Sequence, residues 1–83
     1  MDLVVEVRGK RLYGIEIKAA RYVSPADLSG LKQFLEDYPH AEGICVCLAE
    51  HPYRKGKISF LPWKYFFDHL AAKAGAGIPV LKA

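Results

Sequence analysis

Two carboxylates and a lysine near the N-terminus are the residues whose types and spacing could do chemistry. Asp2 precedes one segment of alternating apolar and polar residues, and Glu16 and Lys18 lie in another. Alternate residues of a strand point to the same face, so Glu16 and Lys18 share one. Mg²⁺ binds one or two carboxylates together with water and phosphate oxygens, and a neighbouring ammonium can neutralise charge that develops on phosphorus. The pattern predicts a metal-dependent phosphodiesterase site, with a solvated cross-strand ion pair as the alternative.

The two strands that carry these residues are expected to pair as an antiparallel hairpin. Asp2 and Glu16 share a face only if the numbers of paired residues add to an even sum. A pairing of Arg8 with Leu12 meets this condition. A two-residue turn at the intervening Gly-Lys sequence would instead pair Arg8 with Arg11 and separate the acids. We therefore predict a three-residue loop or a bulge between Arg8 and Arg11.

The length and composition indicate one small domain spanning residues 1–83. Hydrophobic residues make up 52% of the chain, which is enough for a packed core, and the net charge of +3 is compatible with phosphate contacts. The sequence has no apolar run of membrane-spanning length and no signal-peptide pattern, so we expect a cytoplasmic protein without a membrane partner. Because the first strand begins at the second residue, we also expect a fragment of a longer protein.

The clearest helix is expected between Ser24 and Pro39. Ser24 suits the N-cap, Pro25 suits the first helical position, and Asp27 stands where a capping-box acid would lie. Apolar residues then recur at three- and four-residue intervals, which indicates the face that packs against a sheet. These residues are Leu28, Leu31, Phe34 and Leu35.

The remaining elements are predicted from apolar runs and from Pro and Gly. Residues 43–49 are almost continuously apolar, as is typical of a strand buried on both faces, and residues 57–61 predict a shorter strand. Residues 51–57 are expected to form a polar turn. Pro62 is expected to open a second helix that ends near residue 73, followed by a flexible tail at residues 76–83. The predicted fold class is α/β, a ββαββα mixed sheet with flanking helices.

Two cysteines in the apolar run invite a metal interpretation. His40 and His51 flank Cys45 and Cys47, but structural zinc sites usually draw their ligands from turns rather than from a buried strand. Free cysteine commonly behaves as a small buried hydrophobe. We therefore interpret Cys45 and Cys47 as core residues on one face of the strand.

Three stretches resemble one known family, namely residues 12–18 (LYGIEIK), 24–39 (SPADLSGLKQFLEDYP) and 61–63 (LPW). They look like the C-terminal domain of uncharacterised bacterial and archaeal P-loop ATPases of the AAA type, and the resemblance covers nearly the whole chain. That domain is similar in pattern to the PD-(D/E)xK, or restriction-endonuclease-like, nuclease fold. The resemblance implies that Asp2 and Glu16 bind Mg²⁺, that Lys18 is the lysine of the D/E-x-K element, and that the Ile17 carbonyl completes the coordination.

The chain departs from the nuclease pattern in two places. The residue before Asp2 is Met rather than Pro, and the helix that normally precedes the first acid is absent. The expected core is therefore a truncated one, with a sheet face left uncovered, which favours a homodimer. The resemblance also implies an upstream ATPase domain as a partner. No G-x-x-x-x-G-K-[ST] motif is present, so no ATP site is expected within these residues.

Further candidate residues lie outside the hairpin. The resemblance implies an accessory role for Gln33, because related nucleases place a glutamine of this helix near the active site; a surface position is the alternative. Arg54, Lys55 and Lys57 could contact the phosphates of DNA or RNA, since Lys and Arg make most such contacts. A solvated hairpin tip is the alternative for this basic turn.

Two functions are consistent with these observations. The first is a Mg²⁺-dependent nuclease domain in which Asp2 and Glu16 bind the metal and Lys18 assists the attacking water. The second is a catalytically silent module that serves the ATPase in dimerisation or docking.

Overall fold

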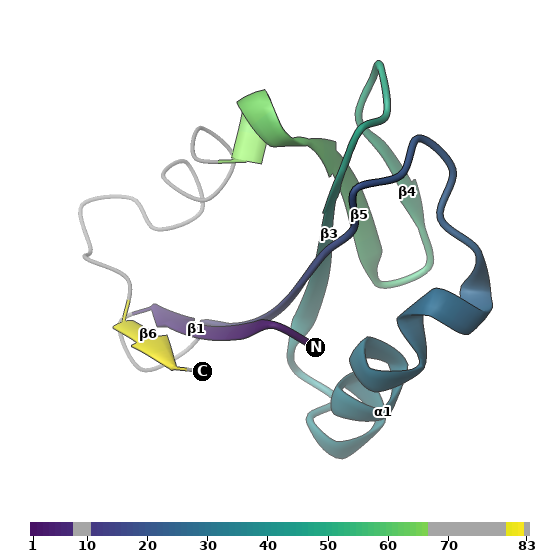
Figure 1. Ribbon diagram of the computed structural model, residues 1–83. Coiled ribbons are helices and arrows are strands. Elements are labelled where there is room, and N and C mark those ends of the chain that lie inside the picture. The colour runs from purple at the N-terminus through teal and green to yellow at the C-terminus, as the bar shows by residue number, and fades with distance from the viewer. Residues whose placement is uncertain (8–10, 67–79, 83) are drawn as a thin grey trace.

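The computed structural model describes residues 1–7, 11–66 and 80–82, which form a small α/β domain (Figure 1). Within these described residues, six strands make one mixed sheet in the order β4-β5-β3-β2-β1-β6. Strands β2, β3 and β5 are parallel to one another, whereas the β1–β2, β1–β6 and β4–β5 pairs are antiparallel. The elements are β1 (Leu3–Val7), β2 (Arg11–Ile17), the 3-10 helix η1 (Pro25–Leu28), α1 (Ser29–Asp37), β3 (Glu42–Cys47), β4 (Tyr53–Lys55), β5 (Ile58–Pro62) and β6 (Val80–Lys82). The predicted mixed α/β sheet is confirmed.

The hairpin of β1 and β2 has the predicted parity but a different pairing. Val7 pairs with Arg11 and Leu3 pairs with Ile15, so paired residue numbers add to an even sum. The predicted pairing of Arg8 with Leu12 is wrong by two positions. Side chains alternate with a period of two, so the predicted and the observed register both place the apolar sides of the two strands together. The hydrophobic pattern therefore cannot distinguish one register from the other. Three residues separate Val7 from Arg11, which excludes a two-residue turn; these residues, 8–10, lie outside the described ones.

The N-terminus of the helical segment forms as predicted. The Ser24 backbone N–H and hydroxyl both donate to Asp27 Oδ2, at 3.2 and 3.0 Å. These bonds lower the pKa of Asp27, and the nearby charge of Lys18 lowers it further. The first turn is the 3-10 helix η1, and α1 continues from it to Asp37, two residues before Pro39. A proline disfavours helical geometry in the residue before it, which accounts for this end.

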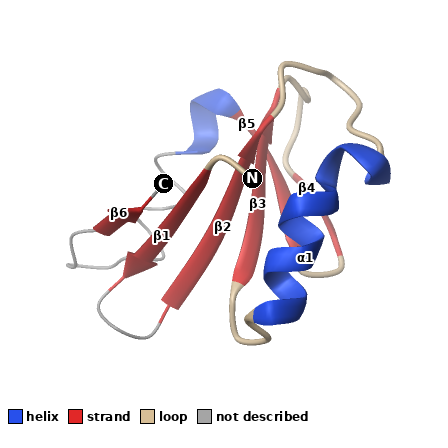
Figure 2. Ribbon diagram, turned by 60° about the horizontal axis from the view of Figure 1, so that its bottom comes forward, coloured by secondary structure: helices blue, strands red, loops and turns tan. Residues whose placement is uncertain are grey.

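Helix α1 covers one face of the sheet (Figure 2). The predicted apolar stripe packs there: Leu31 is fully buried, and Leu28 and Phe34 are nearly so. Gly14 lies beneath the helix, and a Cβ atom at this position would come within 2.6 Å of Phe34 Cδ2. The absence of a side chain in the middle of β2 therefore lets α1 approach the sheet closely. Cys45 and Cys47 belong to the same buried cluster as free thiols, as predicted for small core residues.

Two short strands were not predicted. Residues 53–55 of the expected polar turn form β4, whose Tyr53 stacks on Phe60 of β5 with ring centroids 4.5 Å apart. Residues 80–82 of the expected flexible tail form β6, which pairs with β1 and supplies partners for its backbone. The predicted order ββαββα is therefore wrong in these two elements. Residues 63–66 are helical, as predicted; the rest of that predicted helix and of the tail lie outside the described residues.

The sheet face opposite α1 is buried, contrary to expectation. Val5, Ile15 and Ile44 on this face are no more than 1% exposed. Leu3 and Phe66 pack against the same cluster. These side chains are therefore covered within the domain, and the expectation of an uncovered sheet face is wrong. The homodimer itself stays a prediction. Among the described residues, no helix is long and apolar enough to cross a membrane.

Candidate active site

The candidate catalytic residues lie at one edge of the sheet. Strands β2, β3 and β5 are parallel, so their carboxyl ends share an edge, which we call the carboxyl edge: the ends of these strands and the residues that follow them. Strand β1 runs the opposite way, so Asp2, which precedes it, lies at the same edge (Figure 2). Ligand sites of open α/β sheets form at this edge.

Glu16 is the buried charged residue of this edge. It is only 6% exposed, on the face that α1 covers. The Met1 α-ammonium lies 3.4 Å from Glu16 Oε1, and Lys18 Nζ lies 3.9 Å from Oε2. Removal of a carboxylate from water is costly unless positive charge compensates it. Each oxygen of this carboxylate therefore faces a cation of the domain itself.

Asp2 is anchored beside the end of β2. Its Oδ2 accepts a hydrogen bond of 2.6 Å from the Ile17 backbone N–H, and its own N–H donates to the Ile15 carbonyl at 3.0 Å. The N–H and C=O of one strand residue point towards the same neighbouring strand. The Ile17 carbonyl is therefore directed to the side of Asp2. The Asp2 carboxylate therefore contacts the backbone of Ile17 on the β1 side of β2. The side chains of Glu16 and Lys18, on either side of Ile17 in the sequence, contact each other.

The oxygen donors of this edge are few, and a metal held by them would keep most of its water. Among the described residues, no group of three or more His, Cys, Asp or Glu side chains could surround one metal. Mg²⁺ does not require such a group, because it commonly takes one or two carboxylates and fills its other positions with water and phosphate oxygens. Asp2, Glu16 and the Ile17 carbonyl are the oxygen groups of this edge that could serve as such ligands.

The other predicted site residues lie apart from this group. Gln33 is exposed on α1, where its Nε2 donates to Asp37 Oδ1 at 3.1 Å. The backbone of the basic turn precedes β5 and so lies at the opposite end of the sheet from Lys18. The Lys55 side chain extends back over Tyr53, with its Nζ 5.9 Å from the ring centroid, and lines a hollow together with Arg21 and Tyr22. Arg54 of the turn bonds the Gly56 carbonyl and faces Glu42, and Lys57 bonds the Pro39 carbonyl. Two of the three predicted phosphate-binding residues are thus engaged within the domain.

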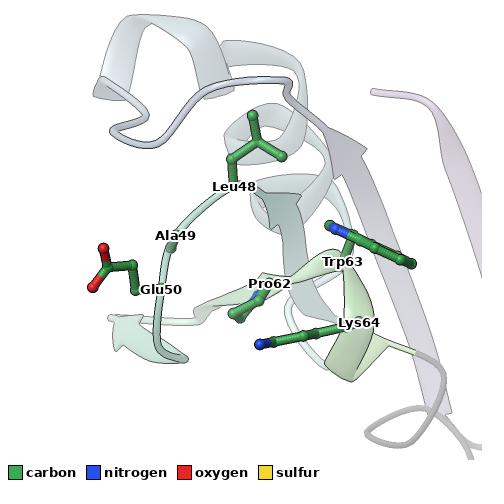
Figure 3. A pocket seen from close by; sticks show the side chains of 6 residues that line it. All are labelled: Leu48, Ala49, Glu50, Pro62, Trp63 and Lys64. Carbon is green, nitrogen blue, oxygen red and sulfur yellow. The ribbon is translucent and has the colours of Figure 1, made fainter.

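Sequence reasoning missed a hollow of about 260 Å³ farther along the carboxyl edge (Figure 3). Leu48, Ala49 and Glu50, from the segment after β3, line one side of it, and Trp63 and Lys64, which follow β5, line the other. The Glu50 carboxylate points away from Trp63 and Lys64 (Figure 3). Trp63 is 67% exposed and Leu48 is 51% exposed. The sequence could have indicated this hollow through the position of its residues. They directly follow two parallel strands, and open α/β sheets bind ligands at that end of their strands.

Cys45 of β3 lies directly beside Glu16 of β2 in the sheet. Its thiol can therefore be used to test whether this part of the protein is buried. Burial, together with Cys47 and the Glu16 charge, raises the pKa of Cys45 from 9.0 to about 12. The unfolded chain then loses its thiol proton at lower pH than the folded protein does, so folding stability falls as pH rises between these values. We expect the free energy of unfolding of Cys45→Ala to change less with pH than that of the wild type. Urea unfolding of both proteins at about pH 8 and about pH 10.5 measures this change. Equal dependence in both proteins would contradict the burial of an ionisable thiol here.

The fold and the carboxyl edge define a small α/β domain with a mixed sheet and a compact acid–lysine site. The chain belongs to the family described as "Domain of unknown function (DUF4143)", whose model matches residues 1–66. The match includes Asp2, Glu16 and Lys18 together with all of α1. No curated protein and no solved structure matches the chain.

Proposed function

We propose that this domain is the nuclease-like C-terminal part of an AAA-type ATPase and hydrolyses phosphodiester bonds in DNA or RNA with Mg²⁺. The observation that carries the proposal is the buried Glu16 carboxylate, which has a cation at each oxygen. Asp2 is hydrogen-bonded to the backbone of Ile17, the residue that follows Glu16. The topology agrees with the proposal: a hairpin bearing an acid and an E-x-K element is followed by a helix and by a strand parallel to the hairpin's second strand. This order resembles part of a restriction-endonuclease-like core, which supports the proposal.

Each residue has a defined part in the proposed reaction. Asp2, Glu16 and the Ile17 carbonyl hold the metal, which when bound would polarise a phosphate oxygen and acidify a water molecule. Lys18, close to Glu16, orients the attacking water and neutralises charge that develops on the phosphate. Cys45, the neighbour of Glu16 across β2 and β3, belongs to the buried cluster under α1, and Glu16 itself is largely shielded from water.

Cleavage of labelled single-stranded and duplex DNA and RNA tests the proposal. We expect cutting that requires Mg²⁺ or Mn²⁺, is abolished by EDTA and is lost in Glu16→Gln, which keeps the side-chain shape and removes the charge. Lys32→Ala is the matched control because Lys32 is exposed on α1. The absence of cutting by the wild type on all four substrates, or equal cutting by Glu16→Gln, would overturn the proposal.

A second function is a catalytically silent docking or dimerisation module of the same ATPase. One observation favours it: Met1 and Lys18 already neutralise Glu16 within the domain, as a purely structural ion pair would. Exposed apolar residues at the carboxyl edge, including Ile17 at 56%, would then contact a protein. Light scattering across a range of concentrations measures whether the domain forms the homodimer that this function includes.

A further inference from the structure

We propose that the carboxyl edge binds single-stranded nucleic acid, with an unpaired base stacked on Trp63. The inference rests on the proposed function and names the substrate class of the same site. Its basis is a continuous aromatic and basic surface beside Lys18, formed by two adjoining hollows.

The first hollow has the size and chemistry of a subsite for one base. Its volume of about 260 Å³ is below the ~300–1,000 Å³ of sites for drug-sized ligands, which suits a single ring system. Trp63 and Leu48 offer apolar surface on two sides of it, and Lys64 extends along a third (Figure 3). An aromatic ring that is two-thirds exposed beside a cation is the arrangement on which unpaired bases stack.

The second hollow continues the same surface. It has a volume of about 430 Å³ and shares Ala49 and Glu50 with the first. Tyr22, which is 85% exposed, and Tyr53 lie in its wall, and Arg21 and Lys55 supply positive charge. Consecutive aromatic platforms joined by basic residues are the pattern of proteins that bind single strands. The pair of hollows therefore accommodates successive bases of one strand.

The charge along this surface favours a phosphate backbone. Arg21, Lys55 and Lys64 line the two hollows, and the one acid in the shared wall, Glu50, lies 3.5 Å from Arg21. That contact neutralises the acid and leaves the surface positive. Duplex DNA would leave Trp63 unused, because its bases are already stacked on one another, whereas a single strand uses both the aromatic faces and the cations.

The surface is continuous with the acid–lysine site. The Lys18 backbone N–H donates to the Val46 carbonyl, and the Leu48 N–H donates to the Ala20 carbonyl. The chain that leaves Lys18 thus runs beside the segment that lines the first hollow. Strand β5, which Trp63 follows, is two strands from β2, or about 10 Å along the edge. A base on Trp63 would therefore place a nearby phosphate of the same strand within reach of Lys18.

Trp63 is the one tryptophan of the chain, so its own fluorescence reports the contact. We would titrate a labelled oligothymidylate of about 12 nucleotides in EDTA and record anisotropy and tryptophan emission. We expect binding with quenched Trp63 emission, roughly tenfold weaker binding by Trp63→Ala and near-normal binding by Trp63→Phe, as removal of one stacked base predicts. Lys32→Ala should bind normally, and an unlabelled duplex of the same length should compete poorly.

Three results would overturn the inference. The first is no binding of the oligonucleotide, which would leave the surface to a protein partner. The others are unchanged affinity of Trp63→Ala for the oligonucleotide, and competition by the duplex that equals competition by the single strand. Because the titration contains no metal, it measures binding to the surface separately from catalysis. Normal binding without any nuclease activity would therefore contradict the catalytic proposal alone, whereas cleavage without Trp63-dependent binding would contradict the inference alone.

Discussion

Replacement of Leu31 by alanine is expected to lower the free energy of unfolding by about 2–5 kcal/mol, which is the usual cost of removing a buried leucine side chain. Leu31 is fully buried in the cluster between α1 and the sheet. Its Cδ1 would lie 3.4 Å from a Cβ at Gly43, so the side chain fills the space above a strand that has no side chain of its own there. Small domains have a total stability of roughly 5–15 kcal/mol, so this variant should approach the unfolding threshold.

Urea denaturation monitored by circular dichroism measures the loss. Lys32→Ala changes the neighbouring exposed residue of the same helix and should stay within about 0.5 kcal/mol of the wild type. A Leu31→Ala variant with wild-type stability would show that α1 does not pack on this face of the sheet.

Replacement of Lys18 by alanine is expected to lower the cleavage rate by roughly 10²–10³-fold, the effect of removing one group that stabilises transition-state charge. Lys18 Nζ lies 3.9 Å from Glu16 Oε2, and the lysine side chain is about one-third exposed, so the ammonium reaches both the buried carboxylate and solvent. Its charge acts on the developing phosphate charge, whereas metal binding depends on the carboxylates. Metal affinity should therefore be retained, or rise because a competing cation has been removed.

Rate constants at saturating Mg²⁺, together with metal affinities, separate the two effects. Lys18→Arg keeps the charge and should recover part of the rate. If Lys18→Ala cuts at the wild-type rate, or if it loses metal binding along with cutting, the assigned part of Lys18 in the reaction is wrong.

Local signals account for what could be predicted from the sequence. The capping box of Ser24 and Asp27, the apolar stripe of α1 and the alternation in β1 and β2 each depend on residues close together in the chain. The placement of Glu16 and Lys18 on one face likewise follows from their spacing within a single strand. These features formed as expected.

Long-range pairing accounts for what could not be predicted. The partner of β1 at its outer edge is β6, more than seventy residues away, and no pattern in the three residues of β6 specifies that contact. The short strand β4 pairs with β5, and its Tyr53 stacks on Phe60; the three residues of β4 do not reveal these contacts by themselves. The hollow beside Trp63 exists only because β3 and β5 end at the same edge. The position of the basic turn, before β5 at the other end of the sheet, also follows from the strand order and could not be predicted without it.

The most direct test of the proposed site is a calorimetric titration of Mg²⁺ and Mn²⁺ into the wild type and Glu16→Gln, each with an acetylated N-terminus. Acetylation removes the Met1 α-ammonium charge, which otherwise competes for Glu16 Oε1. We predict that the wild type binds one metal ion and that Glu16→Gln binds none. Absence of binding in the acetylated wild type, or equal binding in both proteins, would contradict the metal site at Asp2 and Glu16 and leave the cluster as an internal ion pair.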